Sequence, residues 1–453
     1  CAAPPVGGAE AGGGMTTKPL VVLDIGSTKV ACAVGRSTNL LRHSLGRQPS
    51  SCRHSLAGED IAGSVGSVEG TASVGRQTEA ATCELLGTGV ASYPTLRTTW
   101  PCDQALLART IEHALEEAHL TSWPDRAIVI LTHPALSHRA VTAQLDLADE
   151  PVTIRGRDLE RLHAQAVSQV LEVDREPLLL DPLGYAGNGF DAAGDPRGLV
   201  ATRMQGRFQL IGIPMAVKRA VLQALDVVGL ELDRVVYSLQ AVAAACVEEP
   251  WRSKRVLLVD LGGCCTDLAL WDNGHLVRST SIPWGGMTVV EAIAADARMT
   301  MDQALTASLE GLNSPHPIIR KVFNEQLRLV ESSLRQLLEG TAHPERAIVT
   351  GRGALIGGLV EWVEQISHTK AVLGRSPLAK GLGDLGRQMA LSPSLGLLQR
   401  VCQTTAVSSH GVPSRVGRST SVLRHSLAGE DIAGSVGIRG SGRLIDRLLA
   451  RTR

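Results

Sequence analysis

Residues 20–34 read LVVLDIGSTKVACAV, and residues 256–271 read VLLVDLGGCCTDLALW. In both stretches an apolar run carries an aspartate near its end, a short glycine-containing turn follows, and a second apolar run resumes. Two apolar segments on either side of such a turn predict a β-hairpin. The chain therefore contains two similar hairpins that lie far apart in the sequence.

A third glycine turn, Thr350-Gly351-Arg352-Gly353, follows the apolar run 347–350. Glycine lets the backbone come close to phosphate oxygens and exposes N–H donors in a concave nest. Ser and Thr hydroxyls add donors, and Asp24 and Asp260, which end the first two strands, can hold a hydrated magnesium ion. One such turn alone is usually a plain hairpin, whereas two hairpins that face each other predict a clamp for a triphosphate between two lobes.

The rest of the pattern alternates strands with amphipathic helices. Apolar spacing predicts helices at 104–120, 158–173, 216–228 and 318–338, and strands at 127–131, 208–213 and 347–350. Strands that alternate with helices favour an α/β fold in which helices cover a sheet, here in two related halves.

Composition excludes several classes of protein. The 453 residues include 45 basic and 45 acidic side chains, and a protein that wraps nucleic acid normally has a basic excess. Aromatic residues make up only 3%, which leaves few stacking platforms for single strands. No apolar run approaches the roughly 18 residues that span a bilayer. The nine scattered cysteines fit a reduced cytosolic setting.

A stretch at about 36–82 is rich in Gly, Ser, Ala and Arg and shows no sustained period, which predicts a flexible insertion. It contains the sequence RHSLAGEDIAGSVG at 53–66, and the same fourteen residues recur at 424–437. Two interpretations stay open. The repeat is either a duplicated coding element tolerated in two surface loops, or a paired docking motif.

The polar, Gly/Ser-rich stretch 403–441 predicts a tether, and an amphipathic segment follows it. As a helix, this segment places Leu444, Ile445, Leu448 and Leu449 on one face and borders that face with arginines. Such a pattern is typical of a helix that lies in the membrane interface with its arginines on anionic head groups. A frayed or docked terminal helix is the alternative.

Three stretches carry a family resemblance: VVLDIGSTKVACAVG (21–35), LLVDLGGCCTDLALWDNG (257–274) and AIVTGRGALIGGL (347–359). They resemble the first phosphate, second phosphate and adenosine motifs of the actin-like ATPase superfamily. Within it the chain most resembles the FtsA family of bacterial cell-division proteins, over nearly everything from Pro19 to Cys402 except the insertion.

The resemblance implies an α/β, actin-like two-lobed fold of duplicated ribonuclease-H-like domains, with a small subdomain inserted into the first lobe. In chain order the implied divisions are a disordered extension at 1–18, the start of the first lobe at 19–84, the inserted subdomain at 85–175, the rest of the first lobe at 176–250, the second lobe at 251–402, a linker at 403–441 and a membrane-targeting helix at 442–453.

The resemblance also implies roles for individual residues. ATP would be held by Gly26, Ser27, Thr28, Lys29, Gly262, Gly263, Thr266, Gly351 and Gly353, and magnesium by Asp24 and Asp260. Gln240 lies in VVYSLQAVAAA (235–245), the segment that connects the lobes, where a polar residue can orient the attacking water. A Gln at a helix start is also common as a surface or cap residue.

Four departures from the family pattern reduce the expected hydrolysis to that of a weak ATPase at most. Cys264 and Cys265 stand where the family usually has a glycine and a threonine, and Arg352 replaces a glycine. The region 301–311 lacks the lysine that the family commonly offers to the nucleotide, and the chain is shorter than expected between Gly311 and Ile318.

The implied function is an ATP-binding scaffold that tethers the tubulin-like division protein FtsZ to the inner face of the cytoplasmic membrane. The implied partners are FtsZ, further copies of the chain and anionic lipids, with no nucleic acid. A pilus-assembly platform protein of the same fold is one alternative. A small-metabolite kinase of the superfamily is another, although no clear catalytic carboxylate is present for it.

Overall fold

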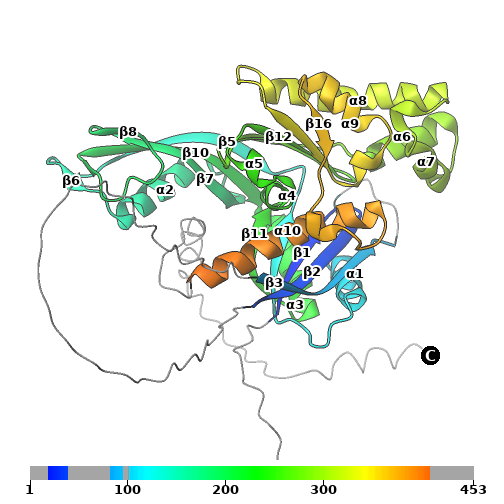
Figure 1. Ribbon diagram of the computed structural model, residues 1–453, viewed down its shortest axis with the longest axis horizontal. Helices are drawn as coiled ribbons and strands as arrows, with labels where there is room; N and C mark the ends of the chain where they lie inside the picture. The colour runs from blue at the N-terminus through cyan, green and yellow to red at the C-terminus, as the bar shows by residue number, and fades with distance from the viewer. Residues whose placement is uncertain (1–18, 39–81, 95–99, 101–102, 409–453) are drawn as a thin grey trace, which may run out of the picture.

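Both hairpins lie at the centre of a five-stranded mixed sheet, one in each lobe (Figure 1). The computed structural model describes residues 19–38, 82–94, 100 and 103–408. From edge to edge, the first sheet consists of β3 (Thr82–Ser92), β2 (Lys29–Thr38), β1 (Leu20–Ile25), β4 (Arg126–Leu131) and β11 (Glu231–Tyr237). The second consists of β14 (His275–Ile282), β13 (Thr266–Asp272), β12 (Val256–Leu261), β15 (Arg346–Thr350) and β16 (Ala371–Leu373).

The two sheets share one topology. In the first, β1 is antiparallel to β2 and parallel to β4, and in the second, β12 is antiparallel to β13 and parallel to β15. Each sheet therefore repeats three antiparallel strands followed by two parallel ones. This duplication confirms the predicted α/β, actin-like architecture.

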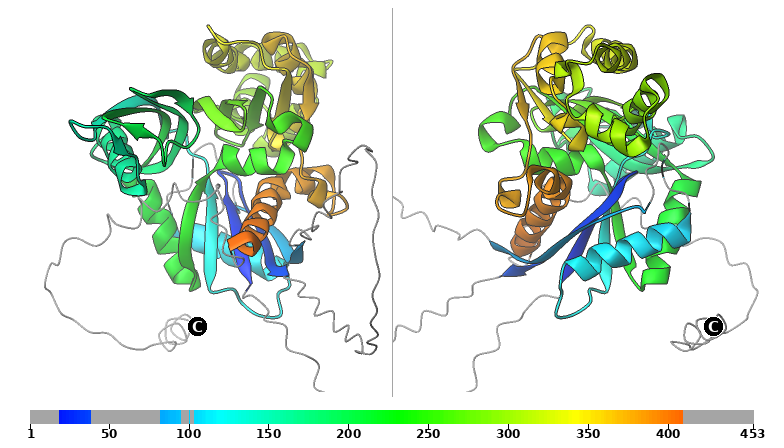
Figure 2. Two further views of the ribbon diagram at one scale, coloured as in Figure 1. Left: turned by 60° about the vertical axis from the view of Figure 1, so that its left-hand side comes forward. Right: turned by 90° about the vertical axis from the view of Figure 1, so that its right-hand side faces the viewer.

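Helices cover both faces of the first sheet, which explains why β1 is apolar on both sides. Val21, Leu23 and Ile25 point toward a core that contains α1 (Gln104–Glu117) and α3 (Met215–Val228), whereas Val22 points toward the opposite core. That second core contains α4 (Ser238–Cys246) and α10 (Leu385–Ser408). Figure 2 shows α1 and α10 on opposite sides of the β1–β2 hairpin.

The second lobe buries its own core beneath a long helix. Helix α8 (Pro317–Leu338) presents Ile319, Phe323, Leu327, Val330 and Leu334 at the spacing of one helical face. The other helices of the lobe are α6 (Gly286–Ala297), α7 (Met301–Ser308) and α9 (Leu359–Ser367). Short helical pieces complete the chain: α5 (Glu249–Arg252), η1 (Gly311–Asn313), η2 (Arg352–Leu355) and η3 (Pro377–Ala379).

A separate four-stranded sheet extends from the first lobe, at the left of Figure 1. Its strands are β5 (Ser137–Asp146), β10 (Arg203–Pro214), β7 (Arg175–Gly187) and β8 (Phe190–Ala193), and α2 (Gly156–Val170) packs against them. Two further short strands, β6 (Val152–Thr153) and β9 (Val200–Ala201), pair with each other. We call this unit, residues 137–214, the inserted sheet.

The inserted sheet lies further along the chain than the predicted subdomain at 85–175. Residues 126–131 form a buried strand between two parallel neighbours, so that β3, α1 and β4 complete the first sheet instead. The sequence-based boundary was wrong because a fully buried apolar strand does not reveal which sheet it joins.

Helix α10, the last one that the structure describes, belongs to the first lobe. The sequence had assigned 251–402 to the second lobe and 403–441 to a linker. Its Leu391, Leu395 and Leu398 pack against β1 and β2, and the helix continues to Ser408. At Gly396 a Cβ atom would overlap Ala245, so only glycine allows α10 to approach α4 this closely.

Several predictions lie outside the described residues: most of the insertion at 36–82, both copies of the repeat and the terminal segment 442–453. Within the described ranges, no helix combines the length and the apolar character that crossing a bilayer requires.

The docking of α10 can be tested on two leucines of the same helix. Leu395 is buried, whereas Leu385 is 40% exposed. We expect Leu395→Ala to lower the free energy of unfolding by about 2–5 kcal/mol, because it leaves a cavity in the core. The control Leu385→Ala should cost less than about 1 kcal/mol. Equal and small losses for both variants in urea unfolding would show that α10 does not pack on the sheet.

Candidate functional site

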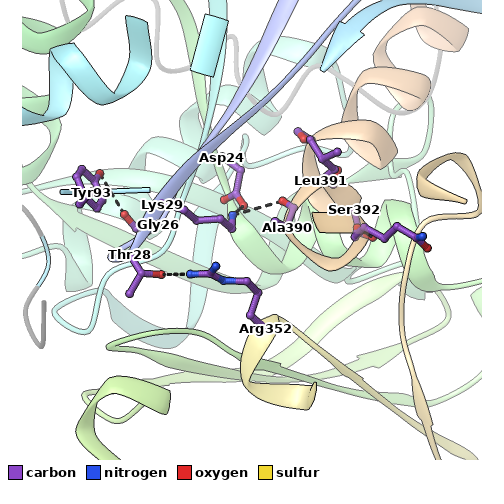
Figure 3. A network of polar contacts seen from close by, with 11 residues as sticks. Asp24, Gly26, Thr28, Lys29, Tyr93, Arg352, Ala390, Leu391 and Ser392 are labelled. Carbon is purple, nitrogen blue, oxygen red and sulfur yellow. Dashed lines mark hydrogen bonds and ion pairs between the residues drawn. The ribbon is translucent and has the colours of Figure 1, made fainter. Parts of the chain in front are cut away.

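The first hairpin turn is closed by its own backbone and tied to α10. The Gly26 N–H donates to the Lys29 carbonyl at 3.0 Å, which forms a tight turn at the end of β1. Lys29 Nζ lies 2.7 Å from Asp24 Oδ2 and donates to the Ala390 carbonyl at 3.3 Å (Figure 3). Both charged side chains are buried in this position, so each one needs the other as a partner.

The second turn is held by the start of helix α6. The Gly262 N–H donates to the Cys265 carbonyl at 3.0 Å. The N–H groups of Gly286 and Met287 donate to the carbonyls of Gly262 and Gly263 at 3.0 and 2.8 Å. These bonds fix the turn on its α6 side, and the Cys264 N–H points toward the first lobe.

The two turns touch each other directly. The Cys264 N–H donates to Ser27 Oγ at 3.0 Å. A methyl group at Gly263 would overlap the side chain of Thr28 and lie 3.0 Å from Ser27 Oγ. The facing turns that the sequence predicted are therefore present, and in this structure they form a closed contact between the lobes.

The third turn packs on the end of β12. Gly351 has a φ of 78°, and an added Cβ at Gly353 would lie 2.7 Å from the Leu261 carbonyl oxygen. Between these glycines, Arg352 extends to the first turn, where its Nη2 donates to Thr28 Oγ1 at 3.0 Å (Figure 3). The arginine that replaces a glycine of the motif is thus a second link between the lobes.

Asp267 is the centre of a hydrogen-bond network that the sequence did not reveal. Its buried carboxylate accepts from the hydroxyls of Thr132, Ser238 (3.0 Å) and Ser281. Burial raises the pKa of Asp267, and the three hydroxyl donors oppose that rise. Only Thr132 could have been suspected from the sequence. It directly follows β4, and functional side chains often lie at the carboxyl ends of parallel strands.

The carboxylates give the interlobe region a negative character. Loss of contact with water raises the pKa of Asp260 to about 7, and the nearby Asp267 and Asp24 add to this effect, whereas Lys29 opposes it. Three carboxyl groups with one ammonium partner attract a further cation.

The carboxylates of Asp24 and Asp260 fit a magnesium ion that is bound together with phosphate oxygens, and not a metal ion that the protein alone would hold. Among the described residues, no group of three or more His, Cys, Asp or Glu side chains has an arrangement suited to a metal ion. Magnesium usually takes only one or two carboxylates and completes its shell with water and phosphate. Asp24 and Asp260 could supply those carboxylates, although Lys29 already pairs with Asp24.

Two predicted residues are placed apart from these contacts. Thr266 is fully buried, and its hydroxyl has no hydrogen-bond partner in the described part of the chain. Gln240 lies on α4, two positions after Ser238, and residues so spaced do not share a helix face. Ser238, rather than Gln240, is the α4 residue bonded to the carboxylate network, and the role of Gln240 stays a prediction.

The raised pKa of Asp260 predicts a dependence of stability on pH. Well below pH 3.8, the ordinary pKa, the Asp260 carboxyl is protonated in the folded and in the unfolded protein. Between pH 3.8 and about pH 7 it is ionised in the unfolded protein and stays protonated in the folded protein. Stability from this group is therefore lost as the pH rises through that window. Asp260→Asn should stabilise the fold above pH 7 by up to about 4 kcal/mol and change little at pH 4. Unfolding curves at both pH values measure this, and a gain independent of pH would contradict it.

Comparison with known proteins adds sequence similarity to this geometry. No family model matches the chain. It is 24% identical over 334 residues to the cell division protein FtsA of Escherichia coli K12, covering 65% of the chain and 79% of the relative. FtsA of Bacillus subtilis 168 is 21% identical over 332 residues, covering 67% and 74%.

Among solved structures, a chain of the PilM–PilN type IV pilus biogenesis complex has a TM-score of 0.55 at 14% identity, covering 85% of this chain and 98% of that one. This likeness concerns the fold alone. With the paired sheets and the facing turns, the comparisons show that the chain is similar in sequence to FtsA proteins and has the actin-like fold.

Proposed function

We propose that the chain is an ATP-binding, actin-like cell-division protein that links a tubulin-like division ring, formed by FtsZ, to the cytoplasmic membrane. The main support is the similarity to FtsA over 334 residues. The direct approach of the two hairpin turns, through Ser27 and Cys264, gives the proposal its site.

A nucleotide would enter this site only if the lobes separate, because the turns meet in the closed structure. Separation breaks two links, Cys264 to Ser27 and Arg352 to Thr28, and frees their donors for phosphate oxygens. Hinged closure of two lobes around a ligand is a common motion of such folds. In this proposal, binding replaces contacts between the lobes with contacts to the triphosphate.

Different residues of the chain would bind different parts of ATP. Gly26, Ser27, Thr28 and Lys29 of the first turn and Gly262 and Gly263 of the second would hold the phosphates, with Thr266 buried beside them, and Gly351 and Gly353 would border the adenosine. Asp24 and Asp260 would hold magnesium, which neutralises charge on the phosphate oxygens when bound. Gln240 would orient water, and hydrolysis would be weak because Cys264 and Cys265 replace the usual loop residues.

The membrane part of the proposal rests on the terminal sequence 442–453. Its leucines and arginines suit an interfacial helix, and the protein would bind the cytoplasmic face of the membrane as a peripheral protein. A segment this short binds weakly alone, so anchoring requires several copies in a self-polymer.

The glycine contact between the lobes provides a test of ATP binding. Gly263→Ala adds a Cβ to the turn whose backbone must come close to the phosphates, at a position that already lies against Thr28 in the closed structure. We expect its affinity for magnesium-ATP to fall by roughly tenfold or more, which corresponds to the usual cost of overpacking. The matched control is Gly156→Ala, because a Cβ there meets nothing within 4 Å. Isothermal titration calorimetry measures both, and wild-type protein that does not bind ATP would overturn the proposed site.

Liposome flotation tests the membrane role. The full chain should float with vesicles that contain phosphatidylglycerol, more so with ATP, and a chain that lacks residues 443–453 should stay at the bottom. High salt should weaken flotation because arginines contact anionic head groups. Equal flotation of both chains would contradict the tether and favour the pilus-platform alternative, which does not need a terminal amphipathic helix.

A further inference from the structure

A cavity of about 610 Å³ lies where the inserted sheet meets the second lobe. Its walls come from the start of β5 (137–140), from β14 (278–281) and from α8 (333–337). Strand β14 also contacts β5, β7 and β10 directly, so the cavity is bounded by elements that pack together. We call it the lobe-junction cavity, and it is separate from the hairpin turns described above.

Positive charge dominates the lining of this cavity. Arg139, Arg175 and Arg278 line it, and Glu172 is the single carboxylate among the lining residues. Glu172 is shared, because Arg175 Nε donates to it at 2.6 Å and Arg139 Nη2 at 3.3 Å. One carboxylate therefore balances three guanidinium groups.

Arg278 is fixed by backbone carbonyls rather than by an acid. Its Nη1 donates to the carbonyls of Leu337 at 3.2 Å and Glu339 at 2.7 Å, at the end of α8. Both acceptors use the same nitrogen atom. The guanidinium is therefore oriented by the helix end and retains further N–H donors for a ligand.

The neutral part of the wall is polar. Gln209 lines it and is only 4% exposed. His138 bonds to Ser279 at 2.7 Å and to Ser281 at 3.0 Å. Burial lowers the pKa of His138 to about 4, with Arg139 adding to the effect, so His138 is neutral near pH 7. The positive charge of the cavity therefore comes from the arginines and not from this ring.

We propose that the lobe-junction cavity binds a small polyanion, a molecule that carries phosphate or several carboxylate groups. The planar guanidinium fork can bind two oxygen atoms of a carboxylate or of a phosphate, and a buried amide contributes a neutral donor. The volume lies in the range of small-molecule sites. A ligand here contacts the inserted sheet and the second lobe at once and stabilises their present arrangement.

The site is also connected to the second hairpin turn. Ser281 bonds to His138 on the cavity side and donates to Asp267 on the other side. Asp267 is the second residue of β13, after Thr266, and in turn accepts from Ser238 on α4. An anion in the cavity therefore acts on the same strand that carries the second turn.

Calorimetry with inorganic pyrophosphate and with citrate, at constant ionic strength, tests this proposal. We expect at least one probe to bind the full chain with micromolar affinity. Arg278→Gln should weaken that binding by about tenfold or more, because a hydrogen bond to a charged group is lost. The control Arg335→Gln removes an exposed arginine of α8 that pairs with Glu331, and it should change nothing.

Two further variants make the outcome decisive. Arg139→Gln, at a half-exposed position, weakens binding even if Arg278→Gln fails to fold. Gly263→Ala, which alters the hairpin turns, should leave pyrophosphate binding intact. The proposal is overturned if neither probe binds, if Arg335→Gln is as damaging as Arg278→Gln, or if Gly263→Ala abolishes binding, which would place the anion at the turns. Because this site is distinct from the turns, failure here leaves the proposed ATP site untouched.

Discussion

The contact between the two hairpin turns is the constraint on which the rest of the structure depends. Each lobe builds its sheet around a strand that ends in an aspartate, and the turns after those strands meet through the Cys264 N–H and Ser27 Oγ. Gly263 is required there because any side chain would occupy the space of Thr28. The turns that hold the lobes together are also the ones that we propose to bind phosphate, once their mutual contact opens.

Several charged side chains surround this contact, and each has a different set of partners. Lys29 pairs with Asp24 and also donates to a carbonyl of α10, so this helix helps to hold the first turn. Asp267 is satisfied by hydroxyls from both lobes, whereas Asp260 keeps a raised pKa. Arg352 brings a positive group from the second lobe to Thr28. The closed state therefore leaves the charge of Asp260 disfavoured unless a cation or a conformational change relieves it.

The sequence predicted the hairpins and the main helices because their signals are local. Apolar runs on either side of a glycine turn define β1–β2 and β12–β13, and the face of α8 follows the helical period. Helix α10 was missed because Pro393, Gly386 and Gly396 interrupt its pattern and because neighbours bury it on several sides, which removes the periodicity.

The site was predictable in part for the same reason. Gly26, Gly263 and Asp260 were found from turn chemistry, whereas Thr132, Ser238 and Ser281 converge on Asp267 from three separate elements. No spacing in the sequence shows that convergence. The link from Arg352 to Thr28 is likewise a long-range contact, which a glycine replacement alone does not reveal.

Hydrogen exchange read by mass spectrometry tests the central claim that a nucleotide replaces the contact between the turns. Peptides that cover 24–29 and 260–267 would be followed with and without saturating magnesium-ATP. The account predicts that exchange changes in both peptides together, because one ligand contacts both turns. Unchanged exchange in both, with ATP present at millimolar concentration, would contradict it.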